Sequence, residues 1–365
     1  MMIYRLIRLI RKELQALLGS KQGRMMLMMP VILQTAIFPF AATLEVKNAS
    51  LAIYNQDDGK AGRELVERLS HTAAFTHIIM VHSQLELNQI VDAQSALLAV
   101  ILPMDLSRQL NAHHPAKIQM VVDGRRSNSG QIASAYALQV VNDYGVEVGA
   151  KPVANIVLRN LYNPNLEYKW HVLPSLVAII TTIGCLIVTA LSVAREREEG
   201  TFDQLLVSPL TPAYIMAGKA IPGVMVACVQ GSFIASVAHW VYGVPFTGSL
   251  LLLFAGMIGY GLALAGVGLF ISSISETQQQ AFLGVFCFMT PAVMLSGYVA
   301  PIENMPLVLQ WIAHLNPLTY FILILKGVFL KGLGFAGAWP YIWPLLLIAF
   351  GSLTSALHLF RRHIA

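Results

Sequence analysis

The segment from residue 195 to residue 206, REREEGTFDQLL, places charged side chains beside apolar ones, between two long apolar stretches. Gly200 predicts the end of an outgoing helix, because glycine readily adopts the backbone conformation that stops one. Thr201 and Gln204 have the spacing of a capping box, which satisfies the first free N–H groups of a new helix. We therefore expect a short helix over 201–207 with an apolar face, whose chemistry is recognition by contact and not bond making.

Residues that could contact a cytoplasmic partner lie on both sides of this glycine. A short helix joined rigidly to two membrane segments could transmit movement from such a partner. The alternative is that the basic residues only anchor the chain at the lipid headgroups and that the helix only turns it. The candidate contact residues are Arg195, Glu196, Glu198, Glu199, Gly200, Thr201, Phe202, Gln204, Leu205 and Leu206.

Motifs for catalysis or for binding a cofactor are missing from the sequence. No phosphate-binding loop of the form G-x-x-x-x-G-K-[ST] occurs: Gly218-Lys219 is followed by Ala220, and Gly59-Lys60 lacks the rest of the motif. The pair His113-His114 precedes a proline and favours a turn over a metal ligand. Without a nucleophile–base set or paired carboxylates, we expect no catalytic residue, no metal and no cofactor bound by this chain.

Long stretches without charge decide where the chain lies. The 56 residues from 220 to 275 contain no Asp, Glu, Lys or Arg. At ~1.5 Å per residue and ~30 Å of hydrocarbon, this length exceeds two crossings of a bilayer. Overall, 56% of the residues are hydrophobic and 12% charged, which is typical of a membrane protein. The spans themselves offer no ionisable pair for a proton relay, so the energy for any transport is expected to come from elsewhere.

The distribution of basic residues predicts the orientation. Basic residues crowd before the first apolar stretch, and Arg361-Arg362 follow the last, which favours a cytoplasmic position for both termini. The net charge of +5 is thereby explained without nucleic-acid binding. The expected segments are an interfacial helix at 1–24, membrane spans at 25–44, 171–194, 220–244, 249–275, 277–299 and 340–360, a domain outside the cytoplasm at 45–170, a cytoplasmic loop at 195–219, outer re-entrant helices at 300–331 and a cytoplasmic tail at 361–365.

Residues 45–170 differ in composition from the rest, because their acidic and basic residues are nearly balanced and apolar runs are short. The pattern alternates between strands and helices, which favours an α/β domain. Strands are expected at 50–54, 76–81, 96–102 and 118–122, and helices at 61–71, 85–92, 106–111 and 129–147. The predicted fold class is thus a polytopic α-helical membrane protein of six spans, with an α/β extracytoplasmic domain inserted between the first two.

Within the segment 1–24, residues 3 to 19 predict an amphipathic helix. Apolar residues at helical spacing form one stripe, and basic residues face away from it, as in a helix that lies in the cytoplasmic headgroup layer. The stripe comprises Ile3, Leu6, Ile10, Leu14, Leu17 and Leu18. The alternative is a solvated start of the first span.

Residues 195–206 resemble the cytoplasmic loop of ABC-2 type permeases, the membrane subunits of one class of ATP-binding-cassette exporters. Pro209 is similar to the proline that closes that loop, and Arg11-Lys12-Glu13-Leu14 resembles the family's interfacial helix. Met305-Pro306 and Asn316-Pro317 resemble its outer segment. The resemblance covers essentially the whole chain and is closest to the multidrug exporters of the family.

This resemblance implies a permease subunit that moves small hydrophobic or amphipathic, drug-like molecules out of the cytoplasm or the inner leaflet of a bacterial inner membrane. ATP and Mg²⁺ would be bound by a separate ATPase subunit, onto which the candidate contact residues would dock. A second permease subunit, identical or paralogous, and a periplasmic adaptor protein are further implied partners. Two alternatives stay open: an ion-coupled or ion-exporting transporter, and a membrane-anchored sensor or assembly protein whose outer domain binds a ligand. The substrate itself cannot be read from the sequence.

Overall fold

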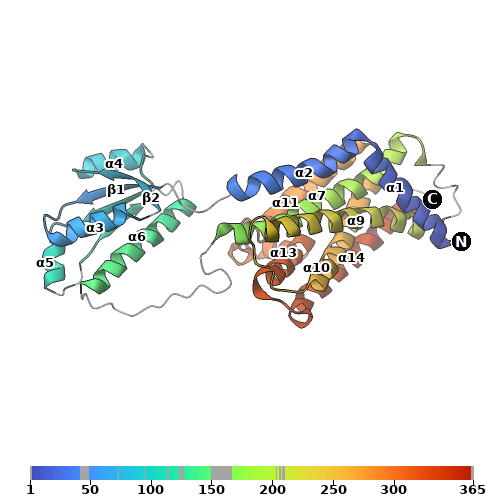
Figure 1. Ribbon diagram of the computed structural model, residues 1–365. Coiled ribbons are helices and arrows are strands. Elements are labelled where there is room, and N and C mark those ends of the chain that lie inside the picture. Colours follow the sequence, from blue (N-terminus) through green and yellow to red (C-terminus); the bar gives the residue numbers. More distant parts are fainter. Residues whose placement is uncertain are drawn as a thin grey trace. The chain divides into compact units, whose positions relative to one another are not determined.

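The chain divides into two compact units in a computed structural model (Figure 1). One unit comprises Met1–Ala42 and Leu161–Ala365, and the other Thr43–Asn160. The structure describes residues 2–41, 49–72, 74–93, 95–112, 114, 116–122, 127–148, 167–202, 204, 207 and 210–362.

The unit Thr43–Asn160 contains a four-stranded sheet of order β2-β1-β3-β4, in which β1 pairs parallel with β2 and β3, and β4 is antiparallel. Every residue of β3 is buried, because apolar helices cover both faces. Helices α3 and α6 pack on one face and α4 on the other (Figure 1). The elements are β1 (Ala49–Asn55), α3 (Lys60–Ser70), β2 (Phe75–Met80), α4 (Gln84–Asp92), β3 (Leu98–Leu102), α5 (Leu106–Asn111), β4 (Gln119–Val122) and α6 (Ser127–Glu147).

The other unit is entirely helical in its described part. Four of its helices, α7, α9, α10 and α14, are long and apolar enough to cross a membrane, and α12 with α13 forms a pair bent by 75° that could count as a fifth. The elements are α1 (Met2–Gly19), α2 (Lys21–Ala41), α7 (Tyr168–Glu198), α9 (Pro212–Trp240), α10 (Leu250–Ile274), α11 (Gln278–Met294), η2 (Ile302–Asn304), α12 (Leu307–His314), α13 (Pro317–Lys326), η3 (Gly327–Lys331) and α14 (Phe335–Arg362).

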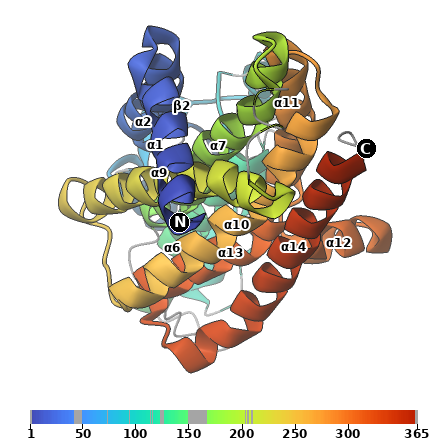
Figure 2. The same ribbon diagram turned by 90° about the vertical axis from the view of Figure 1, so that its right-hand side faces the viewer.

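Helix α7 forms the centre of this bundle, since α2, α9, α10, α11 and α13 all pack on it (Figure 2). Small residues allow the close approach that stabilises helices in lipid. A Cβ at Gly268 of α10 would collide with Thr189 of α7, and a Cβ at Gly266 would collide with Ser352 of α14. The bundle therefore depends on glycine where three helices meet.

Two helix boundaries position the charged residues of the site. The third span was expected at 220–244, and it belongs to the longer helix α9, which begins at Pro212, where a proline needs no N–H partner. Lys219 consequently lies inside a helix and is completely buried. The amphipathic helix expected over residues 3–19 corresponds to α1, which ends at Gly19 within the segment 1–24, and the Ser20 hydroxyl accepts a hydrogen bond from the N–H of Gly23 at the start of α2.

Candidate functional site

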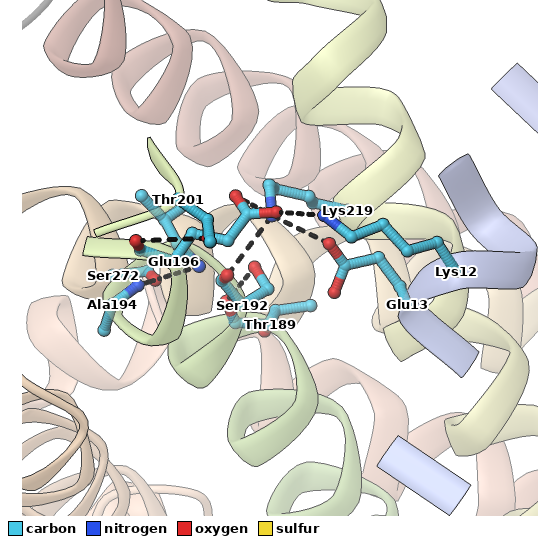
Figure 3. A network of polar contacts seen from close by, with 10 residues as sticks. Lys12, Glu13, Thr189, Ser192, Ala194, Glu196, Thr201, Lys219 and Ser272 are labelled. Carbon is cyan, nitrogen blue, oxygen red and sulfur yellow. Dashed lines mark hydrogen bonds and ion pairs between the residues drawn. The ribbon is translucent and has the colours of Figure 1, made fainter. Parts of the chain in front are cut away.

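Four charged side chains from three helices meet beside the end of α7 (Figure 3). The ammonium Nζ of Lys219, on α9, lies 2.8 Å from Glu13 Oε1 of α1 and 2.8 Å from Glu196 Oε2 of α7. Glu196 Oε1 in turn lies 2.9 Å from Lys12 Nζ of α1. Lys219 Nζ also donates a hydrogen bond to the backbone carbonyl of Ser192, at 3.2 Å. We call Lys12, Glu13, Glu196 and Lys219 the charge network.

The packing of α1 on α9 positions the network (Figure 2). Glu13 follows Leu9 and precedes Leu17 at intervals of four residues, so the three side chains share one face of α1. All three are buried. A Cβ at Gly218 would collide with Leu9, so the glycine before Lys219 lets α1 approach the backbone of α9. Helix α1 thus places the carboxylate of Glu13 beside the ammonium group of Lys219, which is completely buried.

The network balances two carboxylates against two ammonium groups. Removing an ion from water costs several kcal/mol in practice, and only a close partner of opposite charge offsets that cost. Lys12 remains more than half exposed, whereas the other three side chains are buried. Partial burial alone would lower the pKa of Lys12, but its hydrogen bond to Glu196 and the neighbouring acidic charges outweigh burial and raise the pKa above its ordinary value. Lys12 is therefore charged at physiological pH.

Gly200 ends α7 in the way the sequence indicated. Its φ angle of +69° lies in the left-handed region, and its N–H donates to the carbonyl of Arg197 at 3.1 Å. The N–H of Thr201 donates to the carbonyl of Glu196 at 2.9 Å, which completes a Schellman motif. The Thr201 hydroxyl also reaches that carbonyl, at 3.4 Å. The predicted capping box of Thr201 with Gln204 stays a prediction, because Asp203 lies outside the described residues.

The last turn of α7 also makes hydrogen bonds to α10 and α11. Arg197 donates hydrogen bonds to the carbonyls of Ser273, at 2.9 Å, and Ser275, at 3.2 Å, where α10 ends. Glu198 Oε2 accepts a hydrogen bond from the N–H of Gln278 at 2.9 Å, at the positive end of the dipole of α11. The end of α7 is therefore bonded to α1, α9, α10 and α11 at once.

Phe202 connects the segment after Gly200 to the end of the chain. Its ring lies 5.0 Å from the guanidinium carbon of Arg197 and meets the ring of Phe360, on α14, edge to face at 5.9 Å. Both contacts are of kinds that stabilise aromatic side chains.

The predicted contact residues separate into groups in the structure. One cavity of about 400 Å³ is lined by Arg195, Glu196, Glu199, Thr201 and Gln204, together with Lys12 and Glu13 of the charge network, Ala16 and Ser192. Glu198 and Phe202 instead contact other helices of the same chain. Leu205 and Leu206 lie outside the described residues. Whether these residues touch an ATPase stays a prediction.

Sequence reasoning missed four members of this site: Lys12, Glu13, Arg197 and Lys219. A signal for two of them was present, because Glu13 is the only acidic residue among the first 44 and Lys219 is the last charge before the long charge-free stretch. The expectation of no ionisable pair concerned the spans 171–194 and 220–244, and the pair of Glu196 with Lys219 lies just outside both, in the parts of α7 and α9 that extend beyond them.

A second hollow lies between α2, α7 and α11. Two adjoining cavities of about 720 and 400 Å³ share Met26, Ile187 and Phe282 as lining residues. Their walls are mostly apolar, and the larger cavity adds polar side chains at the end of α7 and the start of α11. These polar residues are Arg195, Glu199, Gln278 and Gln279. We call these adjoining cavities the α2–α11 groove.

Apolar helices of membrane length, a charge network where α7 ends, and a long apolar groove together define a multi-pass membrane protein built for transport. The chain belongs to the ABC-2 family of transporters, since residues 21–358 match the family described as ABC-2 family transporter protein. It is a permease subunit of this family, whose members work with an ATPase subunit.

Relatives of this chain also carry the name permease. The probable multidrug ABC transporter permease YbhR of Escherichia coli strain K12 is 50% identical over 367 residues, which cover 100% of both chains. The inner membrane transport permease YhhJ of the same strain is 30% identical and covers 97% of this chain and 96% of its own. The probable multidrug ABC transporter permease YbhS is 31% identical over 64% of each chain.

Proposed function

We propose that this chain forms the membrane pathway of an exporter of small hydrophobic or amphipathic, drug-like molecules, and that a separate ABC ATPase supplies the energy. The observation that carries the proposal is the charge network beside the predicted docking segment. Multidrug permeases among the relatives support the class of substrate. The substrate leaves the cytoplasm or the inner leaflet.

The docking segment, residues 195–207, receives the movement of the ATPase. A displacement at Gly200 and Thr201 acts on α1 and α9 through Glu196, on α10 through Arg197 and on α11 through Glu198. A buried charge that loses its partner raises the free energy by several kcal/mol. Helices joined by buried ion pairs therefore favour two paired arrangements over the unpaired states between them. The network thus suits a transmission that switches between discrete states.

The α2–α11 groove forms half of the pathway. Its apolar walls suit an amphipathic molecule, and its polar residues lie at the end where the docking segment starts. A second permease subunit, identical or paralogous, covers the groove and completes the pathway. A periplasmic adaptor protein is a further candidate partner.

In this proposal the chain crosses a bacterial inner membrane six times with both termini in the cytoplasm. Residues 45–170 fold as an extracytoplasmic domain, 300–331 enter the outer leaflet and return, and α1 lies at the cytoplasmic surface. The chain hydrolyses no ATP and binds no cofactor itself; ATP and Mg²⁺ belong to the ATPase.

The test is purification of the permease with the ATPase encoded beside it, followed by ATP hydrolysis in lipid with and without a hydrophobic dye as substrate. Dye-stimulated hydrolysis in the wild type and its loss in Glu196→Gln support the proposal. Glu303→Gln, which removes an exposed carboxylate of η2, is the matched control and retains stimulation. Equal stimulation in all three proteins contradicts the proposed coupling.

A further inference from the structure

Helix α1 has three faces, of which the charge network uses only one. The face with Leu9, Glu13 and Leu17 is buried against the bundle. A second face is apolar but exposed: the side chains of Ile3, Ile7 and Leu18 are 72%, 56% and 54% accessible. This face requires an apolar cover that the described part of the chain does not provide.

The third face is basic and adjoins the exposed apolar face. At 100° per residue, Arg8, Arg11 and Lys12 follow one another around the helix beside Ile7. All three are exposed, and Arg5 lies on the same side. The only acidic residue of α1, Glu13, is buried and paired with Lys219, so it does not neutralise this face. The exposed surface of α1 therefore combines an apolar stripe with a basic stripe, in which Lys12 is also paired with Glu196.

We propose that α1 binds an anionic phospholipid, with its apolar face among the acyl chains and the lipid phosphate held by Arg8, Arg11 and Lys12. A protein surface would need to match both an apolar and a basic stripe, whereas an anionic leaflet offers both at the depth of a helix in its interface. The spacing of the two stripes along one helix suits lipid in particular.

The lipid competes with Glu196 for Lys12. An ammonium group has three N–H donors. One donor of Lys12 makes a hydrogen bond of 2.9 Å to Glu196 Oε1. Because Lys12 is exposed, its other N–H donors can bind a lipid phosphate. The ammonium group then attracts the carboxylate of Glu196 less strongly. Bound lipid consequently weakens the link between α1 and α7. This regulatory part rests on the proposed coupling function, but the binding of lipid does not.

The test measures binding of short-chain phosphatidylglycerol and phosphatidylcholine to the purified full-length chain in neutral detergent, by microscale thermophoresis. We expect binding of phosphatidylglycerol only, weakened by salt. Arg8→Gln with Arg11→Gln should reduce the affinity about thirty-fold, from ~1 kcal/mol per basic residue near a surface. These two residues lie outside the buried network, so the variant folds. Arg361→Gln with Arg362→Gln removes the same charge from the exposed end of α14 and retains the affinity.

Competition for Lys12 has its own signature. Glu196→Gln removes the competitor, so phosphatidylglycerol should bind more tightly to this variant than to the wild type, whereas Lys12→Gln should bind it more weakly. Equal affinity for both lipids overturns the proposal, as does an undiminished affinity in the Arg8/Arg11 variant. Inorganic phosphate that displaces the lipid at equal concentration would define a general anion site instead. Loss of ATPase co-purification in the Arg8/Arg11 variant without any lipid effect would identify the basic face as a protein contact.

Discussion

At the scale of single residues, Lys219 is the most constrained side chain of the charge network. It has no exposed surface and makes close contacts with two carboxylates and a backbone carbonyl. A buried charge is tolerated only with such partners, so each member of the network depends on the others. The network therefore fixes how α1 sits on α7 and α9.

Replacing Lys219 by Met should destabilise the helical unit by about 3–5 kcal/mol, because Glu13 is left buried without its cation. Adding Glu13→Gln should recover part of this loss, since Glu196 then keeps Lys12 and the network is again neutral. Thermal unfolding in detergent, followed by size-exclusion chromatography, measures both variants. Strictly additive losses would show that Glu13 and Lys219 do not interact.

Asp57, at the end of β1, ties the loops of the other unit together. Its carboxylate accepts hydrogen bonds from the hydroxyl and N–H of Ser107 and from the N–H of Gly62. Burial alone would raise the pKa of Asp57, but these hydrogen bonds outweigh it and hold the pKa below its ordinary value. The ionised form thus stabilises the fold.

A carboxyl group with a lowered pKa contributes stability above its unfolded pKa of about 4, and this contribution is lost as the pH falls through its lower folded pKa. We expect hydrogen exchange at β1 and the start of α3, corrected for intrinsic rates, to accelerate in that acid range. Asp57→Asn should exchange faster at neutral pH and show less dependence on pH. The same pH profile in variant and wild type would exclude Asp57 as the cause.

At the scale of elements, Gly200 sets the direction in which the chain leaves α7. A Cβ at this position would meet no atom of the described residues within 4 Å, so the constraint that the structure shows is the positive φ angle. Left-handed backbone costs a residue with a Cβ roughly 1–2 kcal/mol, and Asn tolerates it best.

Gly200→Val should therefore impair dye-stimulated ATP hydrolysis of the complex, while Gly200→Asn retains most of it. Valine and asparagine are similar in size but differ in their tolerance of left-handed backbone, so the pair separates backbone conformation from steric bulk. Protein level and oligomeric state serve as controls for folding. Full activity in the valine variant would mean that the docking segment needs no fixed direction.

At the scale of the whole molecule, the proposed topology predicts that Leu85 lies outside the cytoplasm and that Val207 lies in the cytoplasm. Cysteines at Leu85 and Val207, whose side chains are 69% and 87% exposed, report on it in a background without Cys287, the exposed natural cysteine. We expect an impermeant thiol reagent to label Leu85→Cys once the outer membrane is opened. Val207→Cys should react only after the inner membrane is opened, and the reverse order would refute the topology.

Purified permease without its ATPase should hydrolyse no ATP, because the sequence contains no phosphate-binding loop. Colorimetric phosphate release, measured after removal of co-purifying ATPase, tests this. Turnover that follows the permease through each purification step would contradict the assignment of hydrolysis to the partner.

Much of the fold could be predicted from local patterns. Each strand and helix expected between residues 50 and 147 has a counterpart at nearly the same residues, because alternation and turn residues act over short distances. The break at Gly200 was predictable for the same reason. The burial of Lys219 inside α9 was not, since a charge beside a charge-free run does not show whether it meets water or a partner.

The sequence by itself determined that this chain is a membrane protein, where its apolar helices fall and which polar segment lies between two of them. Length, hydropathy and charge placement suffice for these conclusions, because a bilayer imposes them on every segment separately. Only the tertiary structure decided that Lys219 meets Glu13, 206 residues away, and that Lys12 meets Glu196, 184 residues away. Which charges pair depends on how helices pack, and small residues such as Gly218 permit that packing without revealing the partner.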